Sequence, residues 1–288
     1  MIEGLRKKSF DSLFSMNTFN KCWPTWREMI FEKTNNFQDP RAIYNLGSHL
    51  REIFRTTGGE GRQQGDLSGG GAAWEALVCW YLNVVMIGSR AIVIKQSRSL
   101  IPPVISDAMS VTYKNVKTNT ESDLSGMVFP QDPAFLQQDY DPIKINEYIH
   151  EKLSKISLHN IQCKTNWNDN AQIPMLWDMV YQFREVRSQS IRVGSSGVDL
   201  NDLADFTYSF VTVPSQNKEI IPNSMCVRRV ESLSGGNYWG RSSARGVAES
   251  VSEIFKRVFG NAFDRDIKGH IAEQLESGAI SIKLLDRP

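Results

Sequence analysis

Two polar side chains, Gln162 and Lys164, stand two residues apart in a segment that predicts a buried strand. On a strand they face the same side, whereas Cys163 between them faces the other side, toward a core. About forty residues upstream, Asp123 opens a second short predicted strand, 123–129. An acid on one strand, with an amide and an ammonium group on the next, suits a metal-dependent phosphodiesterase. The oxygens would hold Mg²⁺, and the lysine would stabilise the attacked phosphate or orient the water.

A further acid, Glu75, lies in the most apolar predicted helix, 72–87. A buried carboxylate without a partner costs several kcal/mol, on the order of 2–7 for a polar group and more for a charge. Glu75 therefore needs either a structural partner or a place at the metal site, and the sequence leaves both readings open.

A glycine-rich segment with aromatic residues, 232–245, is a candidate DNA-reading loop. With a neighbouring predicted strand, 224–230, it forms the best local basic patch, and such patches read base edges or hold phosphates. The residues proposed to contact DNA are Arg228, Asn237, Tyr238, Arg241 and Arg245. The alternative is a tight turn packed by Trp239, because turns use the same glycines.

Two other polar segments are open to two interpretations each. Asn166 and Asn168 follow the Gln162 strand, where they could face phosphates, or they could serve only in turn formation and helix capping. The glycine-rich segment 57–71 fits a flexible loop near DNA or a nucleotide-binding loop, although no Gly-Lys-Ser/Thr sequence ends it.

The composition is that of an ordinary globular protein. Hydrophobic residues make up 41% and charged residues 23%, and the formal net charge of +1 argues against a histone-like, purely electrostatic binder. The 4 Cys and 4 His are scattered, without metal-ligand spacing, so reduced thiols are expected. We see no signal peptide and no apolar run of membrane-spanning length. A cytoplasmic protein without membrane contact is therefore predicted.

The order of predicted elements indicates a mixed α/β fold with a central sheet. Residues 1 to about 60 are predicted to be helical, with Thr25 capping one helix and Asp39 another. Later helices are predicted at 141–153, 242–259 and 266–275, and strands at 90–95, 110–113, 206–213 and 279–284. No linker divides the chain, so we expect one domain over 1–288, with a helical N-terminal part of about 1–70.

The positions of Glu75, Asp123 and Gln162-Cys163-Lys164 resemble the PD-(D/E)XK nuclease superfamily and, within it, the type II restriction endonucleases. This resemblance implies a central mixed β-sheet flanked by helices and Mg²⁺-dependent hydrolysis of phosphodiester bonds in double-stranded DNA at a specific short sequence. It also implies a homodimer that cuts both strands of a palindrome, in the bacterial cytoplasm.

Carried over residue by residue, the resemblance makes Asp123 the acid that bridges the metal. Gln162 and the carbonyl of Cys163 would be further metal ligands. Lys164 would act on the attacking water or the phosphate, and Glu75 would assist from its helix.

The sequence departs from the family pattern at two positions. Gln162 replaces the more usual acid, which leaves less negative charge for the metal and makes Glu75 more necessary. Ser122 stands where the motif has proline, and Glu121 is a rival to Asp123 as the metal acid. Two alternatives therefore remain: a DNA-binding protein whose metal site has decayed, and a repair or structure-specific nuclease.

Overall fold

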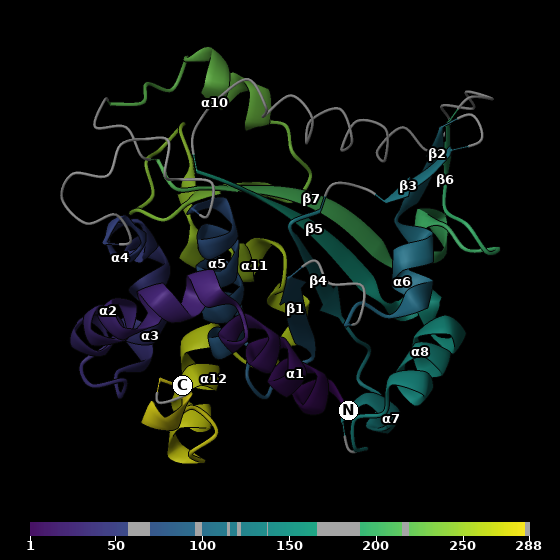
Figure 1. Cartoon of the computed structure of the whole chain (residues 1–288), viewed down its shortest axis with the longest axis horizontal. Helices are drawn as coiled ribbons and strands as arrows, with labels where there is room; N and C mark the ends of the chain where they lie inside the picture. The colour runs from purple at the N-terminus through teal and green to yellow at the C-terminus, as the bar shows by residue number, and fades with distance from the viewer. Residues whose placement is uncertain are drawn as a thin grey trace.

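The computed structural model is built around a mixed sheet of six strands (Figure 1). Their order across the sheet is β1 (Ala91–Lys95), β4 (Leu124–Val128), β5 (Ser157–Lys164), β7 (Asp205–Thr212), β8 (Gly236–Trp239) and β9 (Glu249–Ser250). The residues described are 1–56, 70–95, 100–113, 116–119, 122–136, 138–165, 191–214 and 219–285.

Strand direction changes in the middle of this sheet. β1, β4 and β5 pair antiparallel, whereas β5, β7, β8 and β9 pair parallel. β5 and β7 are the longest strands and lie side by side at the centre (Figure 1). β5 is buried along nearly its whole length, as a strand covered on both faces must be. The predicted central mixed sheet flanked by helices is confirmed.

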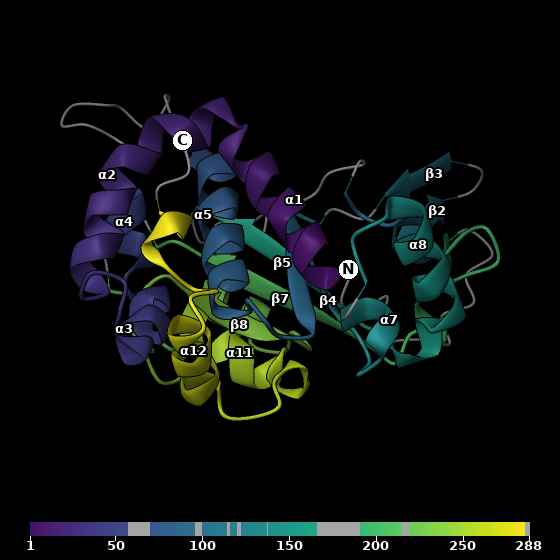
Figure 2. The same ribbon diagram turned by 90° about the horizontal axis from the view of Figure 1, so that it is seen from below.

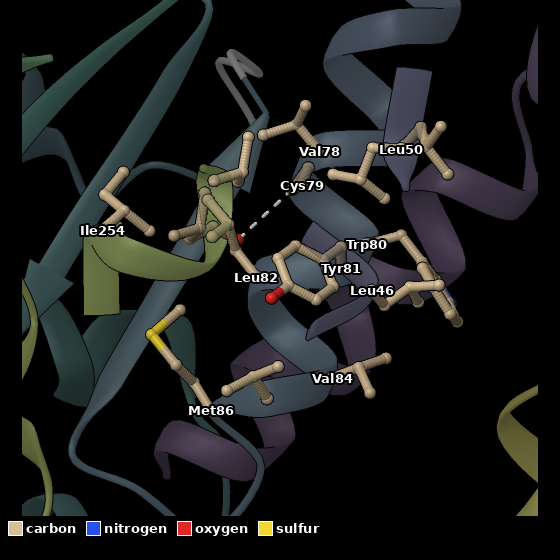
Figure 3. Packing of buried hydrophobic residues seen from close by; sticks show 14 of the residues in the cluster. Leu46, Leu50, Val78, Cys79, Trp80, Tyr81, Leu82, Val84, Met86 and Ile254 are labelled. Carbon is tan, nitrogen blue, oxygen red and sulfur yellow. Dashed lines mark hydrogen bonds between the residues drawn. The ribbon is translucent and has the colours of Figure 1, made fainter. Parts of the chain in front are cut away.

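One face of the sheet is covered by helix α5 (Gly70–Val85). Nearly all of its side chains from Ala73 onward are buried, so the helix is apolar on all sides and is surrounded by protein. Around it pack α2 (Asn17–Lys33), α4 (Leu50–Arg55), α11 (Ile254–Arg257) and α12 (Ile267–Glu276). Figure 3 shows Trp80, Tyr81 and Leu82 of α5 with Leu50 of α4, Ile254 of α11 and Leu46, which lies in a 3₁₀ turn before α4.

The second face carries a smaller core. It contains apolar side chains of α6 (Pro103–Ala108), α7 (Pro133–Leu136), α8 (Pro142–Glu151) and α10 (Met225–Val230). Helix α1 (Ile2–Phe14) contributes side chains to both cores.

A three-stranded sheet of β2 (Ser110–Tyr113), β3 (Val116–Asn119) and β6 (Ile191–Val193) lies beside α6. Figure 2 shows β2, β3 and α8 at the opposite end of the molecule from α2 and α4. The remaining short elements are α3 (Pro40–Asn45) and the 3₁₀ turns Leu46–Ser48, Leu153–Lys155, Leu200–Asp202, Val251–Glu253, Gly260–Ala262 and Ile282–Leu284.

The N-terminal part is helical as predicted, with α1 to α4 lying between residues 2 and 55. Asp39 caps α3, since its carboxylate accepts a hydrogen bond from the Arg41 N–H at 2.8 Å, and Pro40 follows it at the first turn. The prediction that Thr25 caps a helix is wrong. α2 already begins at Asn17, and Pro24 is inside it.

Three predicted elements take another form. Residues 225–230 form helix α10, in which Val227 and Val230 are buried at helical spacing. The helix predicted over 242–259 is interrupted, because Gly246 has a φ of +74° and a short bridge joins Ala244 to Ala248. β9 and α11 follow instead. The strand predicted at 279–284 contains a 3₁₀ turn.

None of the helices in these described ranges combines the length and apolar character needed to cross a bilayer. All four cysteines have free thiols.

Candidate active site

The residues with predicted catalytic roles meet at one end of the central sheet. Lys95 is the last residue of β1 and pairs with Leu124, the first residue of β4. Leu124 pairs in turn with Ile161 of β5. Asp123, one position before β4, therefore lies beside Gln162. Strand register alone thus brings together residues that are far apart in the chain.

Asp123 is fixed by β5. Its Oδ2 accepts hydrogen bonds from Gln162 Nε2 at 2.6 Å and from the backbone N–H of Cys163 at 2.7 Å. Among the described residues, none donates a hydrogen bond to its Oδ1. The carboxylate is therefore oriented by the strand that carries the amide and the lysine.

Gln162 is nearly fully buried, with 2% of its surface exposed. Its Oε1 accepts a hydrogen bond from the hydroxyl of Tyr208, on β7, at 3.2 Å. The amide thus links the carboxylate on one side to a buried phenol on the other. Tyr208 was not predicted from the sequence, because an alternating strand does not indicate which of its side chains meets an amide on the neighbouring strand.

The alternation predicted for β5 is confirmed. Cys163 belongs to the core packed against α5, together with Ile161. Gln162 and Lys164 lie on the opposite side, which is the side of Leu158 and the smaller core. Lys164 is half-buried at the strand end, and its ammonium forms no hydrogen bond or ion pair with a described residue.

Glu75 has a structural partner and also influences the site. Its Oε2 forms an ion pair with Lys95 Nζ at 2.7 Å. Burial and, after it, the negative charge of Glu75 raise the pKa of Asp123 to about 6, against the opposing effects of Lys164, the Cys163 N–H and Lys95. Both readings of Glu75 left open by the sequence are therefore compatible with its position. Lys95 was missed, although its place at the end of the first strand indicates it.

The candidate ligands suit Mg²⁺ when the side-chain amide of Gln162 turns its oxygen, and not its nitrogen, toward Asp123. Mg²⁺ prefers oxygen ligands, and Asp123, the Cys163 carbonyl and Glu75 supply oxygen. Gln162, as described, turns its nitrogen toward Asp123. Rotating the amide by half a turn presents Oε1 instead, and Tyr208 can then accept from Nε2, since a phenol both donates and accepts. Within the described residues, no three His, Cys, Asp or Glu side chains are grouped so that they could hold a metal ion. A site here would therefore need the glutamine or a backbone carbonyl as a further ligand.

Three of the predicted DNA contacts are arginines on segments that pack together through Val227, Trp239 and Val247. Arg228 is exposed on α10 and Arg245 is exposed in the turn before β9. Arg241 is exposed just after β8, with its guanidinium 5.6 Å from the centre of the Trp239 ring. Asn166, Asn168 and the rival acid Glu121 lie outside the described residues, as does the segment 57–69.

One of these contacts is corrected, that of Tyr238. The segment 232–245 is not an open loop, because it contains β8. Tyr238 is fully buried and its hydroxyl donates to the Gly235 carbonyl at 2.8 Å, so it does not face a ligand. Asn237 is half-buried and its amide donates to the Val247 carbonyl at 3.0 Å. The alternative reading, a turn packed by Trp239, describes this segment better, since Trp239 is 6% exposed.

No model of a known protein family matches the chain, and no curated protein sequence matches it.

Proposed function

We propose that the protein is a type II restriction endonuclease, which hydrolyses phosphodiester bonds of double-stranded DNA at a specific short sequence with Mg²⁺ as cofactor. The observation that supports this most directly is the junction of Asp123 with Gln162 and Cys163, held at 2.6 and 2.7 Å beside Lys164. A carboxylate, an amide and an ammonium group on adjacent strands are the groups that metal-assisted phosphoryl hydrolysis requires.

In this proposal each side chain has a defined role. Asp123, Gln162 through Oε1 and the Cys163 carbonyl would hold Mg²⁺, which when bound supplies Lewis-acid polarisation of the phosphate and a more acidic water. Lys164 Nζ would donate to the attacking water or to a phosphate oxygen, where negative charge develops. Glu75 would add negative charge at the site while Lys95 keeps it fixed.

The glutamine changes the charge of the site. A carboxylate at position 162 would place a second negative charge next to Asp123, whose pKa is already raised to about 6. The neutral amide avoids this repulsion, and hence Asp123 is more readily ionised than it would be beside an acid. The neutral glutamine thus offers the metal less negative charge than an acid would, but it favours the ionised form of Asp123.

The test is a digest of unmethylated plasmid and phage DNA with Mg²⁺ and with EDTA. Discrete fragments that form only with Mg²⁺ are the expected result, and mapping their ends gives the recognition sequence. A smear, or cutting restricted to branched or damaged DNA, would instead identify a nonspecific or repair nuclease.

A DNA-binding protein without hydrolytic activity is the second candidate. The specific observation in its favour is the amide orientation, with Gln162 Nε2 and not Oε1 facing Asp123. A gel shift without cleavage under any divalent cation would support this candidate. If the Gln162→Glu variant then cleaved DNA, the glutamine at position 162, and not the fold, would be what prevents hydrolysis.

A homodimer is part of the proposal, because cutting both strands of a palindrome is served by two related active sites. Light scattering coupled to gel filtration, with and without DNA, measures the mass. A monomer in both conditions would require a different route to double-strand cleavage.

A further inference from the structure

Asn160, in the middle of β5, is a buried polar side chain without a partner. It is 0% exposed, and neither Nδ2 nor Oδ1 of its amide has a hydrogen-bond partner among the residues that the structure describes. A buried amide that makes no hydrogen bond is costly, because its atoms have lost water and gained no replacement. Buried groups of this kind are rare in folded proteins and need a physical reason.

Two other buried side-chain amides beside this sheet are engaged. Asn83 of α5, also 0% exposed, donates from Nδ2 to the Val93 carbonyl at 2.6 Å and accepts from the Val93 N–H at 3.2 Å. Gln162, two residues after Asn160, makes the two hydrogen bonds described above. The fold thus satisfies two comparable amides and leaves Asn160 with unused hydrogen-bonding capacity.

Strand register places Asn160 directly beside the residue that holds Gln162. Asn160 pairs with Tyr208 of β7, and the side chains of paired residues lie on the same face of a sheet, at a strand spacing of about 4.8 Å. Gln162 faces the same side, since it is two residues along β5. The Tyr208 hydroxyl, which donates to Gln162 Oε1 at 3.2 Å, therefore has a second side-chain amide on the strand that it faces.

Rotation of the Gln162 amide changes the hydrogen bonds of Tyr208. As described, Nε2 of Gln162 faces Asp123, whereas coordination of Mg²⁺ needs the oxygen Oε1 on that side. After half a turn Nε2 faces Tyr208, whose hydroxyl then becomes the acceptor. The phenolic proton needs an acceptor of its own, because a buried O–H without one is costly. Asn160 Oδ1 is such an acceptor, on the residue paired with Tyr208.

The second paired neighbour of Asn160 can take the other end of its amide. Asn160 pairs with Ser125 of β4. The contacts of the Ser125 hydroxyl with described side chains are long, 3.4 Å to Ser122 Oγ and 4.0 Å to Met109 Sδ. A hydroxyl both donates and accepts, so Ser125 can receive Asn160 Nδ2 once Oδ1 is directed to Tyr208. Both ends of the amide would then be satisfied.

We propose that Asn160 is a positioning residue, which accepts a hydrogen bond from the Tyr208 hydroxyl when Gln162 turns Oε1 toward the metal; this inference rests on the proposed function. Asn160 touches neither metal nor substrate and acts through Tyr208 and Gln162. Its amide lacks a partner in one arrangement of the three side chains and gains one in the other. Asn160 thereby favours the arrangement that presents oxygen to Mg²⁺, as groups behind a metal ligand commonly do.

The experiment measures Mg²⁺ affinity by titration calorimetry of the full chain without DNA. The variants are Asn160→Leu, Tyr208→Phe and the double variant. Asn160→Leu should bind Mg²⁺ about 10-fold more weakly, the usual effect of losing a group that orients a metal ligand. The double variant should bind no more weakly than Tyr208→Phe alone, because the two residues act through one hydrogen bond.

Gln162→Glu separates the orientation of the amide from general damage to the site. A carboxylate presents oxygen in either orientation and needs no rotation. Adding Asn160→Leu to Gln162→Glu should therefore change the Mg²⁺ affinity by less than about 2-fold. Equal losses with and without Gln162→Glu would overturn the inference, since they would indicate that Asn160→Leu disrupts the site in another way.

Melting temperatures in EDTA give a readout that is independent of the metal. Asn160→Leu should raise the melting temperature by about 2–4 °C, because it removes two buried polar atoms that have no partner. Asn83→Leu is the matched control and should lower it, since the amide that it removes is hydrogen-bonded. A lower melting temperature for Asn160→Leu would mean that Asn160 is engaged without metal, and would overturn the inference.

The inference and the proposed function can fail separately. Parental Mg²⁺ affinity in Asn160→Leu would overturn the inference even if the protein cuts DNA, and so would a parent chain that binds no Mg²⁺. The expected loss of affinity, in a protein that never cuts DNA, would support the inference while the proposed hydrolysis fails.

Discussion

At the scale of single residues, the chemistry depends on how one carboxylate is held. Asp123 accepts two hydrogen bonds on one oxygen and is raised in pKa to about 6 by burial and by Glu75. Lys164, on the same side of β5 as Gln162, lowers that pKa, so the two residues are electrostatically linked although no hydrogen bond joins them. Their roles are therefore separable by substitution.

Replacing Lys164 with alanine should remove cleavage and preserve DNA binding. The ammonium would act on charge that develops in the transition state, and loss of one such group costs roughly 10²–10³-fold in rate. Single-turnover cleavage and anisotropy on the same preparation measure the two properties. Lys144→Ala, at an exposed position on α8, is the control and should cut at the parental rate. Parental cleavage by Lys164→Ala would show that the lysine was misassigned.

His159 should make the protein less stable in mild acid. Burial lowers its pKa to about 3, while Nδ1 lies 2.8 Å from Thr207 Oγ1. The unfolded histidine titrates near 6.5, so its contribution to stability is complete above that pH and is lost as pH falls toward 3. Between pH 7 and pH 5 the loss is about 2 kcal/mol, measured by urea unfolding.

Asparagine at position 159 can keep a hydrogen bond to Thr207 and cannot titrate. His159→Asn should therefore lose about 2 kcal/mol less stability than the parent over the same pH interval. His150→Asn, at an exposed position on α8, should keep the parental dependence. Equal pH profiles for His159→Asn and the parent would mean that His159 is accessible to protons.

At the scale of elements, strand register positions the candidate site. A separate junction, in which the Arg51 N–H donates to the Gly240 carbonyl at 2.8 Å, holds α4 against the end of β8. The register follows from the pairing of β1, β4, β5 and β7. The junction depends on Gly240, because a Cβ at this position would lie 2.8 Å from the backbone nitrogen of Arg51.

Gly240→Ala should destabilise the protein, because its Cβ would lie 2.8 Å from the Arg51 nitrogen and α4 would have to move. Overpacking of this kind costs about 1–3 kcal/mol, measured by denaturant unfolding. Gly260→Ala is the control, since its nearest neighbour atom is at 3.7 Å, and it should be nearly neutral. A Gly240→Ala variant as stable as the parent would mean that the junction is loose.

Much of this arrangement was predictable from local pattern. The strands at β1, β5 and β7 and the helix α5 are dense in apolar or β-branched residues, and Gln162-Cys163-Lys164 alternates as expected. Short segments were not predictable. Residues 225–230 suit a strand or a helix equally by residue type, because a run this short does not distinguish the two periods.

The prediction that Tyr238 contacts DNA was wrong for a related reason. Glycine, tyrosine and tryptophan occur both in exposed loops and in buried edge regions, so their types did not indicate that Tyr238 would be covered. Lys95, Tyr208 and Arg51 were missed because their importance arises from neighbours that are distant in the chain.

At the scale of the whole molecule, the site joins elements spread from α5 to β7 around one sheet. Binding of an ion at this point should therefore stabilise the folded chain as a unit, since a ligand that binds only the native state shifts unfolding by mass action.

Mg²⁺ should raise the melting temperature without DNA. At ten times its dissociation constant the ion stabilises by about 1.4 kcal/mol, roughly 3 °C for a chain of this size. Scanning calorimetry with 0 and 10 mM Mg²⁺ measures the shift.

Asp123→Asn should abolish this shift, because it removes the carboxylate. Without Mg²⁺ the same variant should be no less stable than the parent, since burial already disfavours the charged form of Asp123. A parental shift in Asp123→Asn would place the metal elsewhere.

The parallel pairing of β5 with β7 has a consequence for how the protein becomes active in a cell. Ser157 pairs with Asp205, and Tyr208 reaches Gln162 only across this pairing. Contacts between residues so distant in sequence form late, because the entropic cost of closing the intervening loop comes first. Such contacts therefore lower the folding rate. A nascent chain that has not yet emerged past residue 212 lacks the central neighbour of β5 and the hydroxyl that holds the amide. The candidate site would thus be assembled only after residue 212 has emerged, which would delay the proposed cleavage until β7 has paired with β5.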